Sequence, residues 1–202
     1  MIDLRPATAD EMVLAFLQAD METPTERGNE FAAALARTGV DRALLIGTDA
    51  DSNNPQQNNI RRCVLGAVRG YGWGQYLFMD FPNDTAWRLV RVTPTEVSGF
   101  KYVNHQEGWA RVSGSTRLVA DGVRNLDHVQ NREIKGNVSA IAARLRQGDR
   151  FPALIAVQSI GAADVVLLEG HTRATAYALT GLPNEVEVFV GTSAHMAGWA
   201  FF

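Results

Sequence analysis

The sequence of 202 residues predicts an α+β fold, with a small mixed sheet after residue 105 and an α/β extension before it. Residues 151–157 and 165–169 are short and apolar, as buried strands are, and residues 185–190 alternate between apolar and polar. Segments with helical periodicity separate these strands, so helices and strands share one core. We therefore divide the chain into an N-terminal α/β region, residues 1–105, and a core region, residues 106–202.

The N-terminal region opens with two predicted helices. Thr8 and Glu11 have the spacing of a capping box, and the apolar residues after them fall on one helical face. A second helix is predicted over residues 26–37, because Gly39 follows it and suits a left-handed cap. The short apolar run 43–46 predicts a buried strand, with a helical turn as the alternative.

A polar run, residues 48–59, predicts a loop before the next helix. That helix has one apolar face, so we expect its arginines to face solvent: Arg61, Arg62 and Arg69. Residues 75–81 and 87–92 are then predicted as two strands joined by a turn. At the start of this part, three aromatic residues lie among glycines and either stack a base or pack in the core: Tyr71, Trp73 and Tyr76.

The core region begins with a helix that Asn137 is expected to cap and Gly148 to end. The strand Val165–Glu169 is apolar almost throughout, which predicts a central place in the sheet. A helix over residues 172–180 connects it to the last strand. The apolar end of the chain, residues 199–202, is expected to dock on the body or on a partner subunit, which allows a homo-oligomer.

The turn between the second core strand and the following helix contains the candidate functional residues. A strand that ends at Gly170 and leads directly into a helix aims backbone N–H groups, with the positive end of the helix dipole, at whatever lies above it. Arg173 can add a bidentate contact to an anion, and His171 can move a proton. Glu169 can position a metal or a substrate hydroxyl. The alternative is a plain turn, with Thr172 as a cap and the charges in solvent.

The order helix, strand, turn, strand, glycine turn, small-residue helix, strand over residues 137–190 resembles the core of the ParB/sulfiredoxin superfamily. The stretch that resembles its phosphate-binding signature is Leu167-Leu168-Glu169-Gly170-His171-Thr172-Arg173-Ala174-Thr175-Ala176. Sulfiredoxins place a catalytic cysteine where Gly170 stands, so sulfinic-acid reduction is not expected. Partitioning ParB proteins continue into a DNA-binding helix-turn-helix, for which this sequence has no counterpart after the last core strand. The turn is similar to the Asp-Gly-His-His-Arg form of the superfamily's ADP-dependent serine kinases.

The resemblance implies a nucleotide-binding enzyme, either a phosphotransferase or a nucleotide hydrolase, that acts on a small molecule. In it, Gly170, His171, Thr172 and Arg173 would hold the phosphates of ATP, ADP or CTP, with Mg²⁺ bridging them. Glu169 and His171 would be the catalytic groups. Arg117 is expected to pair with a second phosphate. The alternatives are a non-catalytic regulatory protein switched by nucleotide, and a ParB-like nuclease.

Composition excludes some classes of protein. The formal net charge is −3, which disfavours a protein that coats nucleic acid, because such a protein needs a basic surface. Cys63 is the single cysteine, so an intramolecular disulfide is impossible. No apolar run reaches the roughly 20 residues that span a bilayer, and the first residues do not resemble a secretion signal. A cytoplasmic protein without a membrane partner is the expectation.

Overall fold

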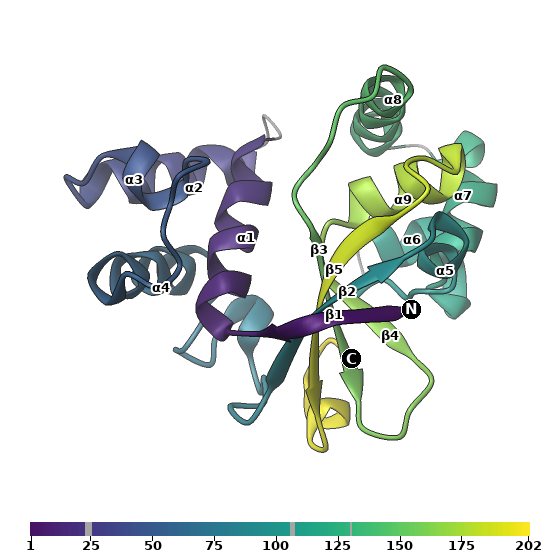
Figure 1. Ribbon diagram of the computed structural model, residues 1–202. Coiled ribbons are helices and arrows are strands. Elements are labelled where there is room, and N and C mark those ends of the chain that lie inside the picture. Colours follow the sequence, from purple (N-terminus) through teal and green to yellow (C-terminus); the bar gives the residue numbers. More distant parts are fainter. Residues whose placement is uncertain (23–25, 106–107, 130) are drawn as a thin grey trace.

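The structure is a computed structural model and describes residues 1–22, 26–105, 108–129 and 131–202. Within these residues, one mixed sheet has the strand order β1-β2-β5-β3-β4, and helices cover both faces (Figure 1). The chain therefore has the predicted α+β fold. Strands β3 and β5 are parallel and the other neighbours antiparallel. The strands are β1 (Ile2–Ala7), β2 (Ala86–Val92), β3 (Leu154–Ser159), β4 (Val165–Glu169) and β5 (Val186–Ser193).

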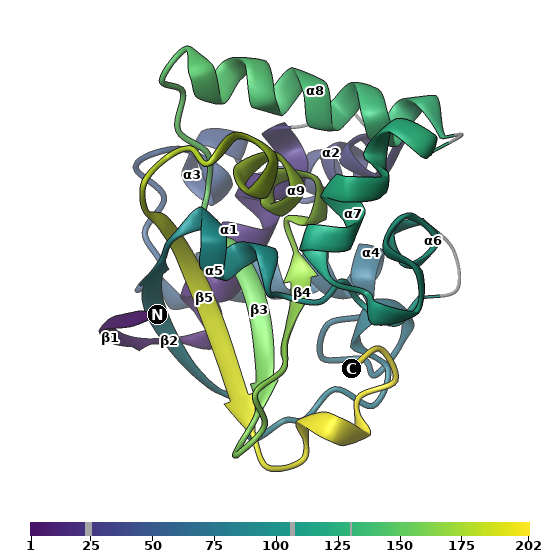
Figure 2. The same cartoon turned by 90° about the vertical axis from the view of Figure 1, so that its right-hand side faces the viewer.

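Two helical layers enclose the sheet, one on each side in Figure 1. The first layer comprises α1 (Ala9–Glu22), α2 (Glu26–Arg37), α3 (Arg42–Ile46) and α4 (Pro55–Arg69). The second comprises α5 (Pro94–Ser98), α6 (Trp109–Ser113), α7 (Val119–Asn125), α8 (Arg132–Arg146) and α9 (His171–Thr180). Figure 2 shows α8 lying across α9, the helix that follows the glycine turn.

Side chains of the inner strands alternate between the two cores. Along β5, Phe189 packs into the first layer, while Val188 and Val190 pack into the second. Helices cover both faces of these strands, so the side chains on both faces must be apolar. This explains why the sequences of the core strands are nearly continuous apolar runs.

The sheet crosses the predicted division at residue 105. β2 pairs with β5 along its whole length, and β1 pairs with the other edge of β2. The N-terminal region therefore supplies two strands to the sheet of the core region, in addition to the helical layer.

Local signals located several elements correctly. The capping box is present, because the backbone N–H of Thr8 donates to Glu11 at 2.8 Å and that of Glu11 donates to the Thr8 hydroxyl at 3.2 Å. The helix over residues 26–37 and the strand over residues 165–169 have the predicted bounds.

Other predictions were wrong. Residues 43–46 do not form the predicted strand but, as in the alternative, a helical turn: they belong to helix α3, which Asp41 caps by accepting from the N–H of Ala43 at 2.9 Å. Residues 75–81 are not a strand, because they contain the 3-10 helix Tyr76–Phe78. Helix α8 begins after Asn131 rather than Asn137.

Strand β4 lies at an edge of the sheet rather than at its centre. Its apolar character comes from the helical layers on both faces. Its outer edge is covered by Lys101, whose backbone N–H donates to the Val165 carbonyl at 2.8 Å.

The expectation that Arg61 faces solvent was also wrong. Arg61 is 0% exposed and lies under the segment that connects α3 to α4. It donates to the backbone carbonyls of Leu45 at 2.6 Å and Asp51 at 2.8 Å. Arg62, one residue on, is exposed and forms an ion pair with Asp10 at 2.5 Å, as the helical pattern predicted. The polar segment has few apolar side chains that could pack on the core. It is held instead by Arg61, which donates hydrogen bonds to a backbone carbonyl within it and to another in α3.

The C-terminal residues dock on the body of the chain. Trp199 is buried, and its indole N–H donates to the carbonyl of Leu77 at 2.9 Å. Farther on, the carbonyl of Phe201 accepts from the N–H of Asn104 at 2.9 Å. Among the described residues, no helix combines the length and the apolar character needed to cross a bilayer.

The packing of Tyr102 on α7 gives a testable consequence. A Cβ atom at Gly122 would lie 2.5 Å from the Tyr102 hydroxyl, which is hydrogen-bonded to Thr175 at 2.7 Å. Gly122→Ala should therefore lower the free energy of unfolding by about 2 kcal/mol, measured in urea. The control is Gly136→Ala in α8, where a Cβ meets nothing within 4 Å, and it should be neutral or stabilising by about 1 kcal/mol. Equal effects of the two variants would contradict this packing.

Candidate functional site

The glycine turn has the backbone that the sequence predicted. Strand β4 ends at Glu169, Gly170 has φ 96°, and α9 begins at His171. A Cβ atom at residue 170 would lie 2.5 Å from Cδ2 of Leu154, so both the conformation and the space require glycine. The first turn of α9 is therefore held close to the start of β3.

Arg173 is buried behind the turn rather than exposed above it. Its guanidinium forms an ion pair with Glu169 and donates to the carbonyls of Pro152 and, at 3.3 Å, of Ala153. These contacts hold β4, α9 and the segment before β3 together. A phosphate that binds this guanidinium must replace the Glu169 carboxylate.

His171 lies against two aromatic rings. Its imidazole stacks with Tyr102, at 5.8 Å between ring centroids, and with Trp109, at 6.2 Å. Its Nε2 atom is buried and has no hydrogen-bond partner among the described residues. Burial, with Arg69 and Arg173 nearby, lowers the pKa of His171 to about 3. The ring is therefore neutral at pH 7 and a weak proton acceptor, although it can still form a hydrogen bond to a ligand.

Two side chains of the first helical layer complete the site. Asp20 of α1 and Arg69 of α4 form an ion pair at 3.2 Å, and Arg69 Nε is buried without a partner among the described residues. The charges of Glu169 and Arg173 act on Asp20, and that of Arg69 acts on His171. We call this group of five side chains the junction cluster: Asp20, Arg69, Glu169, His171 and Arg173.

Sequence reasoning found the three members of the cluster on the turn and missed the two from the helical layer. Arg69 was assigned to a solvated helix face. Asp20 had a local signal, because it is an acid near the C-terminal end of α1, where the helix dipole disfavours negative charge and no basic residue is present. Such a position indicates a partner from elsewhere in the fold.

The remaining predicted residues lie at the side of the cluster. Thr172 is half-buried in the first turn of α9. Arg117 donates to the backbone carbonyl of Tyr102 at 3.2 Å. Within the described part of the chain, Arg117 does not contact the cluster directly. It contacts Tyr102, whose ring stacks on that of His171.

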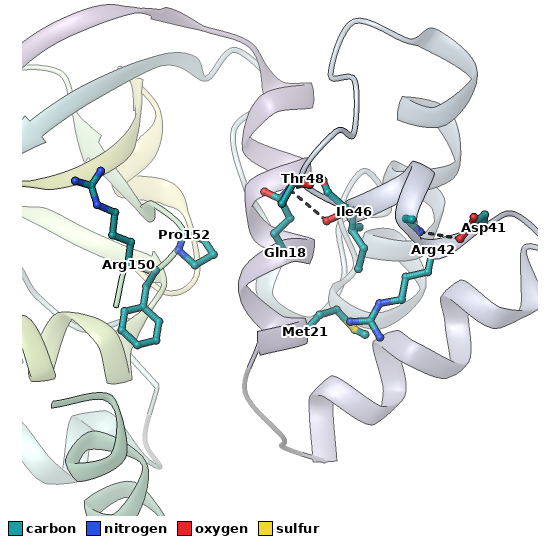
Figure 3. Close-up of a pocket in the computed structure, with 11 residues that line it drawn as sticks. Gln18, Met21, Asp41, Arg42, Ile46, Thr48, Arg150 and Pro152 are labelled. Atoms are coloured by element: carbon teal, nitrogen blue, oxygen red, sulfur yellow. Dashed lines mark hydrogen bonds between the residues drawn. The ribbon is translucent and has the colours of Figure 1, made fainter. Parts of the chain in front are cut away.

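A cavity of about 690 Å³ opens between the first helical layer and the segment before β3, and none of the five cluster residues is among those that line it (Figure 3). Gln18 and Met21 of α1 form one wall and Pro152 the opposite one, and the Pro152 carbonyl accepts from Arg173. In Figure 3, Arg42 extends towards Met21, whereas Arg150 turns away from α1. The volume is in the range of small-molecule sites.

Asp20 makes the stability of the cluster depend on pH. Burial, together with the charge of Glu169, raises its pKa from 3.8 to about 6, while Arg69 opposes the shift. Between these values the folded protein keeps a proton that the unfolded chain releases, so this group destabilises the fold increasingly as pH rises, up to about pH 6. Asp20→Asn removes the effect.

We therefore expect the free energy of unfolding of Asp20→Asn, relative to that of the native protein, to increase with pH across this window and then level off. Urea unfolding at half-unit pH intervals measures the difference. A difference that does not change with pH would show that Asp20 titrates normally.

No family model matches this chain, and comparison with curated proteins and with solved structures finds no match either. The resemblance to the ParB/sulfiredoxin superfamily therefore stays a prediction.

Proposed function

We propose that this protein binds a phosphate-bearing small molecule, specifically a nucleotide such as ATP, ADP or CTP, at the junction cluster. The observation that carries the proposal is a pair of buried polar atoms, Arg69 Nε and His171 Nε2, that have no hydrogen-bond partner in the part of the chain that the structure describes. The charges of Arg69 and Arg173 both act on His171. Unsatisfied buried donors are costly, and native proteins keep them mainly where a ligand, an ion or water satisfies them. A phosphate oxygen accepts from both atoms when the His171 proton is on Nε2.

The charges of the cluster allow a phosphate group to take the place of one of its carboxylates. Two guanidinium groups face two carboxylates, so the cluster is neutral when Asp20 is ionised. A phosphate group brings more negative charge and more acceptor oxygens than either carboxylate, and it matches the geometry of a guanidinium. We expect the phosphate to replace Asp20 on Arg69 or Glu169 on Arg173. The start of α9 favours the same charge.

The cavity supports this position. Arg173 does not line the cavity, but Pro152 does and accepts from Arg173, so one residue separates the cavity from the arginine that would bind the phosphate. The base and sugar would occupy the space between α1 and residues 150–152.

Mg²⁺ does not fit as a resident ion of this site. Its two carboxylates, Asp20 and Glu169, are each bound to an arginine, and no group of three or more candidate ligand side chains occurs among the described residues. In this proposal Mg²⁺ arrives on the phosphates of the nucleotide, as it commonly does.

The two groups predicted to be catalytic favour a nucleotide-switched protein over a phosphotransferase or hydrolase. His171 is neutral and Glu169 is held by Arg173, so neither is a ready general base at pH 7. Turnover would require the phosphate to release Glu169 first. The acidic net charge makes a nuclease the least favoured of the three.

Isothermal titration calorimetry with ATP, ADP and CTP, with and without Mg²⁺, tests the proposal. Arg173→Gln and Arg69→Gln should each weaken binding by about tenfold or more, because a charge-assisted contact is lost. The matched control is Arg62→Gln, an exposed arginine on the same helix as Arg69, and it should leave the affinity unchanged. Circular dichroism spectra of the variants, compared with that of the native protein, check that each variant is folded.

Phosphate release, measured in the same samples, separates a switch from an enzyme. Binding without release identifies a switch, whereas release that Arg173→Gln abolishes identifies a hydrolase. If no nucleotide binds, or if all three variants bind equally well, the proposed function is wrong.

A further inference from the structure

A second cavity, of about 420 Å³, shares no lining residue with the junction cluster. The segment between α4 and β2 forms most of its wall, together with Ala9 and Trp87. The residues that line it are Ala9, Tyr71, Gly72, Gly74, Phe78, Asp80, Phe81, Pro82, Asn83, Thr85 and Trp87.

The lining combines aromatic rings with uncharged or acidic polar groups. Tyr71, Phe81 and Trp87 supply apolar surface, while Asp80 and Asn83 supply hydrogen-bonding groups. No lysine or arginine is among these residues, so the one charged side chain that a phosphate group would meet there is the Asp80 carboxylate. The cavity therefore selects against the anions that suit the junction cluster.

The polar side chains on this wall are available to a ligand. Neither the Asp80 carboxylate nor the Asn83 amide has a hydrogen-bond or ion-pair partner among the described residues, and neither is buried. Asp80 offers acceptors only, whereas Asn83 offers both donors and acceptors. Together they complement hydroxyl groups, which donate and accept.

Trp73 adds an exposed ring beside the cavity. It lies between Gly72 and Gly74, which both line the wall, and it is 57% exposed. Its ring packs on α4, since a Cβ atom at Gly66 would lie 3.0 Å from Cε2 of Trp73. Because residue 66 has no side chain, one side of the indole can pack directly on the helix, while much of the ring stays exposed to solvent.

The backbone of this segment is also strained. Tyr76 and Asp80 have φ values of 47° and 58°, in the left-handed region that non-glycine residues rarely adopt. Within the described residues, Arg117 is the one other non-glycine residue of this kind. Such conformations persist where surrounding contacts fix them, and they concentrate at ligand sites.

We propose that this cavity binds a neutral, hydroxyl-rich ring, that is, a sugar. The apolar C–H face of a sugar ring packs on exposed aromatic surface, here that of Trp73 or Tyr71. Its hydroxyl groups donate to Asp80 and exchange hydrogen bonds with Asn83. They also donate to Thr85, whose own hydroxyl donates to the Pro82 carbonyl at 2.7 Å. A few polar groups on an otherwise apolar wall are the usual means of fixing a small ligand's orientation.

Saturation-transfer-difference NMR tests this site with glucose, galactose, mannose and N-acetylglucosamine, and with their disaccharides, each at about 10 mM, a concentration that detects millimolar affinities. At least one sugar should give a transfer signal. Trp73→Ala and Asp80→Asn should reduce its affinity by about tenfold, which corresponds to one good contact. Asparagine tolerates the left-handed backbone at residue 80, so this variant keeps its fold.

The control is Met79→Ala, an exposed residue of the same segment that does not line the cavity, and it should leave the signal unchanged. Absence of a signal from every sugar overturns the proposal, as does a signal that survives both Trp73→Ala and Asp80→Asn. Binding of free adenine or uracil in place of the sugars would also overturn it, because the site would then recognise a base.

Discussion

Arg61→Ala is expected to lower the free energy of unfolding by about 3 to 5 kcal/mol, because several hydrogen bonds to one buried charged donor are lost together. Its guanidinium donates to five acceptors: the carbonyls of Leu44, Leu45 and Asp51, and the side chains of Gln57 and Asn58. Alanine removes these bonds and leaves buried carbonyls without donors. The segment between α3 and α4 would lose its anchor.

Chemical denaturation measures this loss, and Arg62→Ala is the matched control. Arg62 is its exposed neighbour in α4, paired with Asp10 at the surface, so its removal should cost less than about 1 kcal/mol. If Arg61→Ala were as mild as this control, the buried position of Arg61 would be wrong.

Arg173→Met is expected to lower the free energy of unfolding by about 3 kcal/mol or more. The Glu169 carboxylate, largely buried, would lose the guanidinium that neutralises it, and the carbonyls of Pro152 and Ala153 would lose their donor. The double variant Glu169→Gln/Arg173→Met removes both charges. It should therefore be more stable than Arg173→Met alone.

Urea unfolding of the two single variants and the double variant gives the coupling energy between the residues. We expect a coupling of about 2 kcal/mol, since each charge is costly without the other. Additive effects would mean that the ion pair does not hold the turn in solution.

Parts of the fold were predictable because their signals are local. The capping box of Thr8 and Glu11 involves residues within one helical turn. Strand β4 coincides with an apolar run that ends just before Gly170. Strand β1 gave no such signal. Its residues are almost all exposed and include Asp3, Arg5 and Pro6, so it lacks the alternation of a half-buried strand.

The failures come from tertiary contacts. Arg61 occupies a position that helical periodicity assigns to solvent, and only the folding of residues 48–54 over it makes it buried. In the same way, the glycines around Trp73 read as a break before a strand, whereas residues 76–78 form a 3-10 helix.

The candidate site shows the same limit. The glycine turn, with Glu169, His171 and Arg173, could be predicted, because strand, glycine and helix follow one another in the sequence. Asp20 and Arg69 lie at least 100 positions earlier in the chain and reach the turn only because α1 and α4 pack on the sheet. The sequence therefore predicted the turn and its three polar side chains, but not the ion pairs that Arg173 forms with Glu169 and Arg69 forms with Asp20.

The most direct test of the central claim is a crystal structure of the protein with bound CTP or ADP. We expect a phosphate within about 3 Å of the guanidinium of Arg69 or Arg173, with Asp20 or Glu169 displaced from it. A nucleotide bound elsewhere, with both ion pairs of the junction cluster intact, would contradict the account.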